Sequence, residues 1–418
     1  MPVAFMVERR HYLCNNCHKH LVERPTLFDP HRNMTVYLVR FVERHVLSEK
    51  IGFANIARRT SLKERTIEDI YKDLIGRLDA RRPIVAPTWL GMARVRGQRG
   101  SEKCILLCDV HTGRVLTIVS DEPSAVRATL TRLTGQSPIR RVTLDFHDPL
   151  RELVGAILPE AIRGVDEDSL ATEFAEVSAR VWSQAIDDLV DSNVISDDER
   201  YTFLRQDLPL LIRRPDQSHR PRAELAAHER NIINKWIRPI PELGAAYRLK
   251  ERFWRLWDLT TPANAKEEVA TWLDDADAAF SPESLHRPYL TPMLDLISKM
   301  RVWRDEIANS IENRVPKGYT SQIHRVRQRV EDLQKLGRGY SCPVLRGRML
   351  YEPNDLALLY GRDDVDADTS GLMRLLNWAD VNRPRHAMKR EPDNGIDLHE
   401  LSRRLQREEL LHKQNKAE

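Results

Sequence analysis

Apolar residues recur at helical spacing in the first part of the chain. Residues 34–47 form one such stretch, and residues 52–78 predict two helices around a tight turn at Ser61-Leu62. The buried stripe of the second helix is Ile67, Ile70, Tyr71, Leu74 and Ile75. Two helices around a short turn are typical of a helix-turn-helix, although any helical hairpin gives the same pattern.

The pattern changes at residue 83, where short apolar runs replace the helical spacing. Three runs separated by turn residues predict an antiparallel three-strand meander, followed by helix, strand, helix and strand. The expected strands are 89–95, 104–109, 114–119, 141–145 and 161–165, and the expected helices are 124–133 and 149–158. This order is that of the ribonuclease H-like fold, whereas a Rossmann fold would alternate strands and helices throughout.

Residues 167–312 look entirely helical and are too long for a loop, so they predict an inserted helical domain with its tryptophans in the core. The fold class is therefore α+β and multidomain. A helix at 320–336 completes the core. The polar tail ends in a mixed-charge helix at 398–411, which suits either docking on the body or on a second copy, or a frayed helix at the surface. The expected segments are 1–33, 34–82, 83–166, 167–312, 313–352 and 353–418.

Composition is that of a globular protein, with 41% apolar and 31% charged residues and no apolar run long enough to span a membrane. Residues 1–10 lack the apolar core of a signal peptide. Five scattered cysteines do not suggest a disulfide framework. We therefore expect a cytoplasmic, nucleoid-associated protein without a membrane partner.

The charge is unevenly distributed. Residues 1–100 contain 19 Lys/Arg and 10 Asp/Glu, whereas the remaining residues are mildly acidic. A second basic patch at 313–348 has nine Lys/Arg against Glu331 and Asp332. Two basic segments on an acidic body favour a polyanion such as double-stranded DNA as the partner, although a solvated surface would look similar.

Short motifs follow one another in a defined order from about His11 to Tyr351. They are Tyr12-Leu13-Cys14-x-x-Cys17, Ile56-Ala57, Glu64-Arg65-Thr66-Ile67, Leu90-Gly91, Val142-Thr143-Leu144-Asp145, Leu158-Pro159-x-Ala161, Trp254–Asp258, Trp303-Arg304, Tyr319-Thr320, Gly337-Arg338-Gly339-Tyr340-Ser341 and Leu345-Arg346. In order and spacing they resemble the ISL-three (ISL3) family of insertion-sequence transposases, over most of the chain.

The resemblance implies three carboxylates that hold two divalent cations for cutting and joining DNA. Asp145 matches the second carboxylate, but Ala93 and Ser321 stand at the first and third positions. Asp109 fits better as a residue of the second strand, and Glu331 lies too far along the last helix to replace the third. Asp148, Asp166 and Asp168 are placed on turns. We therefore predict that no catalytic set is intact and that the chain is not an enzyme.

The resemblance also implies an N-terminal zinc ribbon, of which only Cys14 and Cys17 remain. A structural zinc site needs four ligands, so His18 or another nearby histidine would have to contribute. An orphan cysteine pair is the alternative. No other cofactor is expected.

Three functions remain open. The first is a transposase-derived protein that binds DNA without cutting it, as a regulator or as a recognition subunit of a larger assembly or homodimer. The second is a divergent but active transposase, and the third is a protein-interaction scaffold. The predicted DNA-contacting residues are Arg58, Arg59, Lys63, Arg65, Thr66 and Lys72 in the helix-turn-helix, and Arg325, Arg327, Arg329, Arg338, Tyr340 and Arg346 near the end of the core.

Overall fold

A computed structural model of the chain describes residues 10–361 except 23–27, 30, 33, 49, 83, 96–102, 213–225, 260, 281–285, 314–320 and 337–339. The chain divides into two units, residues 1–41 with 360–418, and residues 42–359. The first unit contains the antiparallel hairpin of β1 (His11–Leu13) and β2 (His20–Val22). Helix α1 (Val36–Val46) begins in the first unit and ends in the second. The helix expected at 398–411 lies outside the described residues.

The second unit begins with the helix-turn-helix that the sequence predicts. Helices α2 (Phe53–Thr60) and α3 (Glu64–Asp79) flank a turn at Ser61, which adopts a left-handed conformation with a φ of 58°. Its backbone N–H donates to the carbonyl of Ala57 and ends the first helix. The predicted apolar stripe of the second helix is buried.

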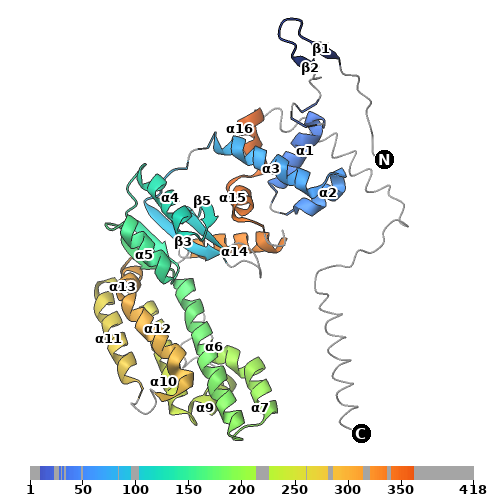
Figure 1. Cartoon of the computed structure of the whole chain (residues 1–418). Coiled ribbons are helices and arrows are strands. Elements are labelled where there is room, and N and C mark those ends of the chain that lie inside the picture. Colours follow the sequence, from blue (N-terminus) through green and yellow to red (C-terminus); the bar gives the residue numbers. More distant parts are fainter. Residues whose placement is uncertain are drawn as a thin grey trace, which may run out of the picture. The chain divides into compact units, whose positions relative to one another are not determined.

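A mixed five-stranded sheet forms the centre of this unit (Figure 1). Its strands are β3 (Trp89–Val95), β4 (Cys104–Asp109), β5 (Val115–Ser120), β6 (Arg141–Leu144) and β7 (Ile162–Val165). The spatial order is β5-β4-β3-β6-β7, in which the first three strands pair antiparallel and β3, β6 and β7 run parallel. This α+β arrangement agrees with the ribonuclease H-like order predicted from the sequence.

The two faces of the sheet are covered by different helices. Leu90 and Met92 of β3 belong to the core that includes apolar side chains of α4 (Pro123–Thr134) and α5 (Asp148–Ile157). Ala93 points to the other face, where it clusters with Ile323 of α14 (Ser321–Leu336). A Cβ atom added at Gly91 would lie 2.9 Å from Ile323 and from the sulfur of Cys108, so the glycine permits this close approach.

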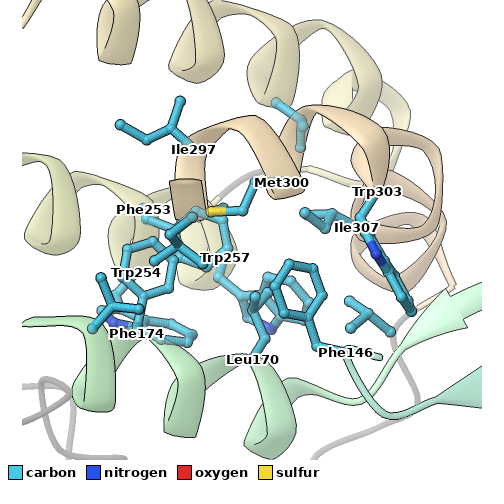
Figure 2. Close-up of a cluster of buried hydrophobic side chains, with 14 of the residues drawn as sticks. Phe146, Leu170, Phe174, Phe253, Trp254, Trp257, Ile297, Met300, Trp303 and Ile307 are labelled. Carbon is cyan, nitrogen blue, oxygen red and sulfur yellow. The ribbon is translucent and has the colours of Figure 1, made fainter. Parts of the chain in front are cut away.

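The inserted block between the sheet and α14 consists, in its described residues, of helices joined by turns. Its elements are α6 (Glu167–Asp191), α7 (Asp197–Thr202), η1 (Phe203–Asp207), α8 (Leu208–Ile212), α9 (Ala227–Ile237), α10 (Pro241–Leu259), η3 (Pro262–Asn264), α11 (Ala265–Ala278), η5 (Pro288–Leu290), α12 (Thr291–Val302) and α13 (Arg304–Glu312). Trp236, Trp254, Trp257, Trp272 and Trp303 are all buried, as predicted. The cluster in Figure 2 extends from these helices to Phe146, whose ring centroid lies 4.9 Å from that of Trp303.

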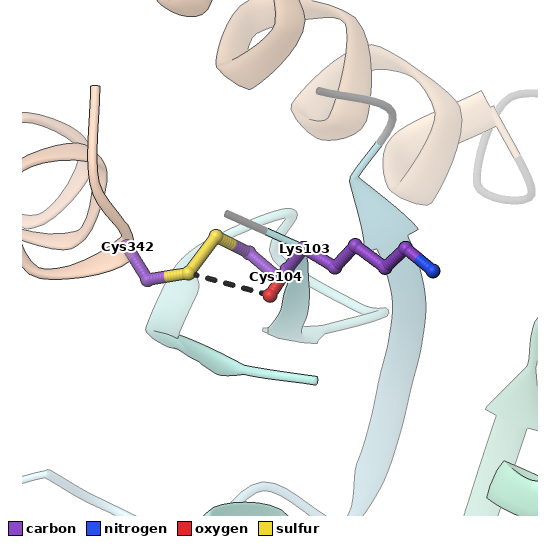
Figure 3. The surroundings of a disulfide bond; sticks show 3 residues. All are labelled: Lys103, Cys104 and Cys342. Atoms are coloured by element: carbon purple, nitrogen blue, oxygen red, sulfur yellow. Dashed lines mark hydrogen bonds between the residues drawn. A yellow bond between two sulfur atoms is a disulfide. The ribbon is translucent and has the colours of Figure 1, made fainter. Parts of the chain in front are cut away.

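The last elements of the second unit are α15 (Cys342–Leu350), η6 (Pro353–Leu356) and the beginning of α16 (Ala357–Tyr360). Cys342 forms a disulfide with Cys104 at the start of β4, with a Cα–Cα distance of 5.9 Å (Figure 3). The sequence analysis, which found no disulfide framework, did not foresee this single bond; it forms because α15 packs against β5 and brings together two cysteines that are 238 residues apart. Among the described residues, no helix is both long and apolar enough to cross a membrane.

Candidate functional site

The position that the resemblance assigns to a catalytic aspartate lies at the centre of the sheet. Asp145 directly follows β6, and its backbone N–H donates to the carbonyl of Met92 at 3.0 Å. Its Oδ2 accepts the N–H of Arg94 at 2.6 Å, so the carboxylate is held against the end of β3. Ala93 is buried beside Ile323, and Ser321 begins the same helix two residues earlier. The three positions named by the resemblance therefore belong to neighbouring elements.

A second carboxylate, which the sequence analysis did not place here, lies beside Asp145. Strands β6 and β7 are parallel, with Leu144 paired to Val165, so the residues that follow them are Asp145 and Asp166. The same guanidinium nitrogen, Nη1 of Arg327, lies 3.4 Å from Asp145 Oδ1 and 3.8 Å from Asp166 Oδ2. Asp166 lies on the connection between β7 and α6, as the sequence analysis placed it, and parallel strand pairing is the signal that would have brought it next to Asp145.

Burial dominates the electrostatics of this pair. It raises the pKa of Asp145 above the ordinary value, and the positive charges of Arg327 and Arg94 offset only part of that effect. Burial and the nearby negative charge of Asp145 raise the pKa of Asp166 well above the ordinary value. Asp166 also caps α6, because its Oδ2 accepts the N–H of Ser169 at 3.0 Å.

The other acids considered from the sequence have different tasks. Asp109 ends β4, and its oxygens accept the N–H of His111 and the hydroxyl of Thr112, which closes the turn to β5. Asp148 accepts the indole N–H of Trp303. Asp168 lies 3.6 Å from the ring of His324.

These side chains, as they are arranged, do not form a site for a divalent cation. Within the described ranges, no group of three His, Cys, Asp or Glu residues is close enough to hold a metal ion. Mg²⁺ requires a nearly complete shell of oxygen ligands, whereas Asp145 and Asp166 share a guanidinium.

Most of the basic residues predicted to contact the phosphodiester backbone of DNA lie on α14 and on the helix-turn-helix. Arg325 and Arg329 are exposed, one helical turn apart, whereas the side chain of Arg327 is only 13% exposed because it faces the acid pair. In the helix-turn-helix, Arg58, Arg59, Lys63, Arg65 and Lys72 are exposed and Thr66 is half-buried. DNA contact by these residues stays a prediction, and Arg338 lies outside the described residues.

Two residues predicted to contact DNA make internal contacts instead of facing solvent. Arg346 of α15 donates to both oxygens of Asp79 at 2.8 and 2.9 Å, and its Nε donates to the hydroxyl of Thr117 at 3.1 Å. The hydroxyl of Tyr340 accepts an N–H from Arg348 at 3.1 Å. Arg348, which the sequence analysis did not single out, is itself buried and donates to backbone carbonyls of Val46 and Ser48.

In the first unit, Cys14 and Cys17 occupy the tip of the β1–β2 hairpin. The N–H of His18 donates to the carbonyl of Cys14 at 2.8 Å, and the N–H of Cys14 donates to Lys19 at 3.0 Å. Backbone hydrogen bonds from Cys17 and Asn16 lower the pKa of the Cys14 thiol, which favours the thiolate form that binds metal. Zinc binding by Cys14, Cys17 and His18 stays a prediction, because the described residues contain no three-ligand cluster.

Comparison with known proteins gives one family. Residues 90–344, well over half of the chain, match the family model of ISL3-type DDE transposases, described as "Transposase". No curated protein matches the chain. The family match contradicts the prediction that the chain is not an enzyme, which rested on the substitutions at Ala93 and Ser321 and on the rejection of Asp109 and Glu331 as replacements.

Proposed function

This chain belongs to the ISL3 family of DDE transposases, and we propose that it acts on the ends of a mobile DNA element as its transposase. The observation that carries the proposal is the family match over residues 90–344, which spans the sheet, the helical insertion and α14. The basic helix-turn-helix that precedes this segment supports binding to duplex DNA.

Asp145 is the residue that we propose for strand cleavage. It lies at the end of the central parallel strand β6, and it is fixed by Arg94 and Arg327. The helical insertion holds the next residue, Phe146, in place. The backbone N–H of Phe146 donates to the hydroxyl of Ser169 on α6, and its carbonyl accepts a hydrogen bond from the ammonium group of Lys299 on α12. The chain thereby places Asp145 between the sheet and the insertion.

The DNA strand would approach from the side of α14. Arg325 and Arg329 are exposed on that helix, and guanidinium groups bind phosphate oxygens with two parallel hydrogen bonds. Substrate positioning by these arginines would bring a phosphodiester to the edge at which β6 and β7 end.

A cleavage and joining assay tests the proposal. The substrate is duplex DNA that carries the sequences flanking the gene in its host, and the proteins are the full chain, Asp145→Asn and the control Asp332→Asn. Asp332 is an exposed residue of α14, so its amide variant should behave as the unmodified chain. We expect specific nicks with the full chain and with the control, and none with Asp145→Asn.

Two other outcomes would contradict the proposal in different ways. Specific DNA binding without any nicking would indicate a DNA-recognition protein. Absence of DNA affinity at low salt would indicate an interaction scaffold, because phosphate neutralisation should make any DNA complex strongest there.

A further inference from the structure

Arg94, at the end of β3, has a guanidinium group whose hydrogen-bond donors are not used inside the fold. Its Nε is buried 3.6 Å from Asp145 Oδ2, which is close enough for charge attraction but too far for a hydrogen bond. Within the described part of the chain, no other group accepts a hydrogen bond from this guanidinium. The side chain is 40% exposed, so Arg94 lies between the carboxylate and solvent.

Two further groups around Asp145 also have donors that the fold leaves weakly used. Nη1 of Arg327 lies 3.4 Å from Asp145 Oδ1 and 3.8 Å from Asp166 Oδ2, distances at which a hydrogen bond is weak or absent. Nδ1 of His147 is buried and has no hydrogen-bond partner among the described residues. Buried polar atoms without a partner are uncommon in folded proteins, and a ligand that presents oxygen atoms would satisfy them.

The groups in contact at this place carry a small excess of positive charge. Burial and the charge of Asp145 raise the pKa of Asp166 well above the ordinary value, which favours its neutral form. Asp168 adds to that effect, but in the described structure it forms no ion pair with Arg94 or Arg327. Two guanidinium charges therefore face the single charge of Asp145. One phosphodiester group carries the negative charge that would balance them.

The family implies divalent cations at these strand ends, but the residues of this chain do not fit such ions. Mg²⁺ takes a nearly complete shell of oxygen ligands, whereas the guanidinium groups of Arg94 and Arg327 lie against the carboxylate of Asp145. A guanidinium repels a metal ion and attracts a phosphate, whose oxygens match its fork of N–H donors. The arrangement therefore suits a phosphate group held by arginine side chains.

We propose that Arg94 and Arg327 bind a phosphate of the DNA strand directly, without a bridging metal ion, and that Arg94 is a positioning residue for that strand. Arg94 approaches the phosphate from β3 and Arg327 approaches it from α14, so the phosphate lies beside Asp145. The identity of the ligand as DNA rests on the proposed function, whereas direct binding by guanidinium groups rests on the contacts described above.

Fluorescence anisotropy of a labelled duplex with the full chain, measured in EDTA over a range of salt concentrations, tests this inference. Arg94→Gln should bind the duplex about tenfold more weakly. The slope of the logarithm of the binding constant against the logarithm of salt concentration should fall by about 0.9, the value for one phosphate. The control is Arg200→Gln, because Arg200 of α7 is similarly exposed and pairs with Asp187. It should bind as the unmodified chain does, and added Mg²⁺ should not change the effect of Arg94→Gln.

Arg94→Gln removes a charge beside a buried carboxylate, so circular dichroism must show that the variant folds. Arg94→Lys is the second variant, because it keeps the charge but lacks the guanidinium fork. It should keep the salt dependence of the unmodified chain and bind the duplex about fivefold more weakly.

Three results would overturn the inference. The first is a folded Arg94→Gln that binds the duplex as the unmodified chain does or, if that variant does not fold, an Arg94→Lys of unchanged affinity. The second is a loss of affinity by Arg94→Gln that appears only with Mg²⁺, which would indicate a bridging cation. The third is an unmodified chain without DNA affinity, and this result alone would contradict the proposed function as well.

Discussion

Arg346 and Asp79 form a bidentate ion pair that connects the helix-turn-helix to the sheet. Asp79 is the last residue of α3, and Arg346 on α15 also donates to Thr117 of β5. The hydroxyl of Tyr351 donates to the same carboxylate at 2.6 Å. The helix predicted to read DNA is therefore attached to the core by side chains from α15 and the residue after it, just beyond the C-terminal end of the family segment.

We expect Arg346→Ala to lower the free energy of unfolding by about 1–2 kcal/mol at neutral pH, a value that allows for the partial exposure of the pair. Although burial alone would raise it, hydrogen bonds from Arg346 and Tyr351 lower the pKa of Asp79. A lowered pKa stabilises the fold above the pKa of the unfolded aspartate and loses that effect as the pH falls. Urea unfolding at neutral and acidic pH should therefore show a difference between the two proteins that shrinks with acidification.

Arg325→Ala provides the control for this prediction, because Arg325 is exposed on α14. Its effect on stability should stay within about 0.5 kcal/mol. A loss of stability by Arg346→Ala that is the same at every pH would show that packing, and not the ion pair, accounts for the role of Arg346.

The disulfide between Cys104 and Cys342 gives a second prediction. It closes a loop of more than two hundred residues, so Cys104→Ser should lower the free energy of unfolding by about 2–4 kcal/mol under oxidising conditions. A thiol reductant should lower the stability of the unmodified chain to a similar value and leave Cys104→Ser unchanged. A reductant that has no effect on the unmodified chain would show that the bond does not form in solution.

The order of elements was predictable from periodicity, and the long-range charge pairs were not. The runs at 89–95, 104–109 and 141–145 show local apolar patterns. The first two match β3 and β4, and the third matches β6 except for its last residue. Arg346 and Asp79, by contrast, are 267 residues apart, and no local pattern indicates that an exposed-looking arginine will be paired inside the fold.

The candidate site was predictable in part. The spacing of Ile323, Val326 and Val330 defines the inner side of α14, and Arg327 lies one helical turn after Ile323 at the margin of that side. Helical geometry therefore separates Arg327 from the exposed Arg325 and Arg329. Its contact with Asp166 depended on the pairing of β6 with β7, which the sequence order suggests only after the fold is assigned.

The raised pKa of Asp166 leads to a third prediction. Burial and the charge of Asp145 raise it, so the folded state binds a proton more readily than the unfolded chain. The contribution of protonated Asp166 to the free energy of unfolding is complete below the ordinary aspartate pKa, about 3.9. It disappears as the pH rises through the pKa of Asp166 in the folded state. At neutral pH, the free energy of unfolding of Asp166→Asn should therefore exceed that of the unmodified chain by on the order of 1 kcal/mol.

Asparagine keeps an oxygen that accepts the N–H of Ser169, so the cap of α6 is retained. The advantage of Asp166→Asn should decrease as the pH is lowered towards 4, roughly the ordinary aspartate value. Thermal unfolding across this range measures it, with Asp332→Asn as the exposed control. Destabilisation of Asp166→Asn at neutral pH would show that the ionised carboxylate and Arg327 stabilise one another more than burial costs.

The last prediction separates base reading from phosphate binding in the helix-turn-helix. Lys63 and Arg65 are exposed at the start of α3, the part of a recognition helix that reaches base edges, whereas Arg58 and Arg59 are exposed at the end of α2. Contacts with phosphates add affinity for every sequence and are lost with added salt, but contacts with base edges distinguish sequences. Arg65→Ala should thus weaken the preferred site by about 1–3 kcal/mol relative to unrelated DNA. Arg59→Ala should weaken binding to the preferred site and to unrelated DNA equally. It should also reduce the slope of the logarithm of the binding constant against the logarithm of salt concentration by about one, the value for one phosphate contact. Fluorescence anisotropy over a range of salt concentrations, with the preferred site selected from random DNA, measures both quantities.

Glu64 and Glu68 share α3 with the residues predicted to read bases, and their carboxylates repel the DNA backbone. The orientation of the helix in the groove must therefore keep them away from phosphates. Uniform weakening of all sequences by Arg65→Ala would show that this helix binds DNA without reading it.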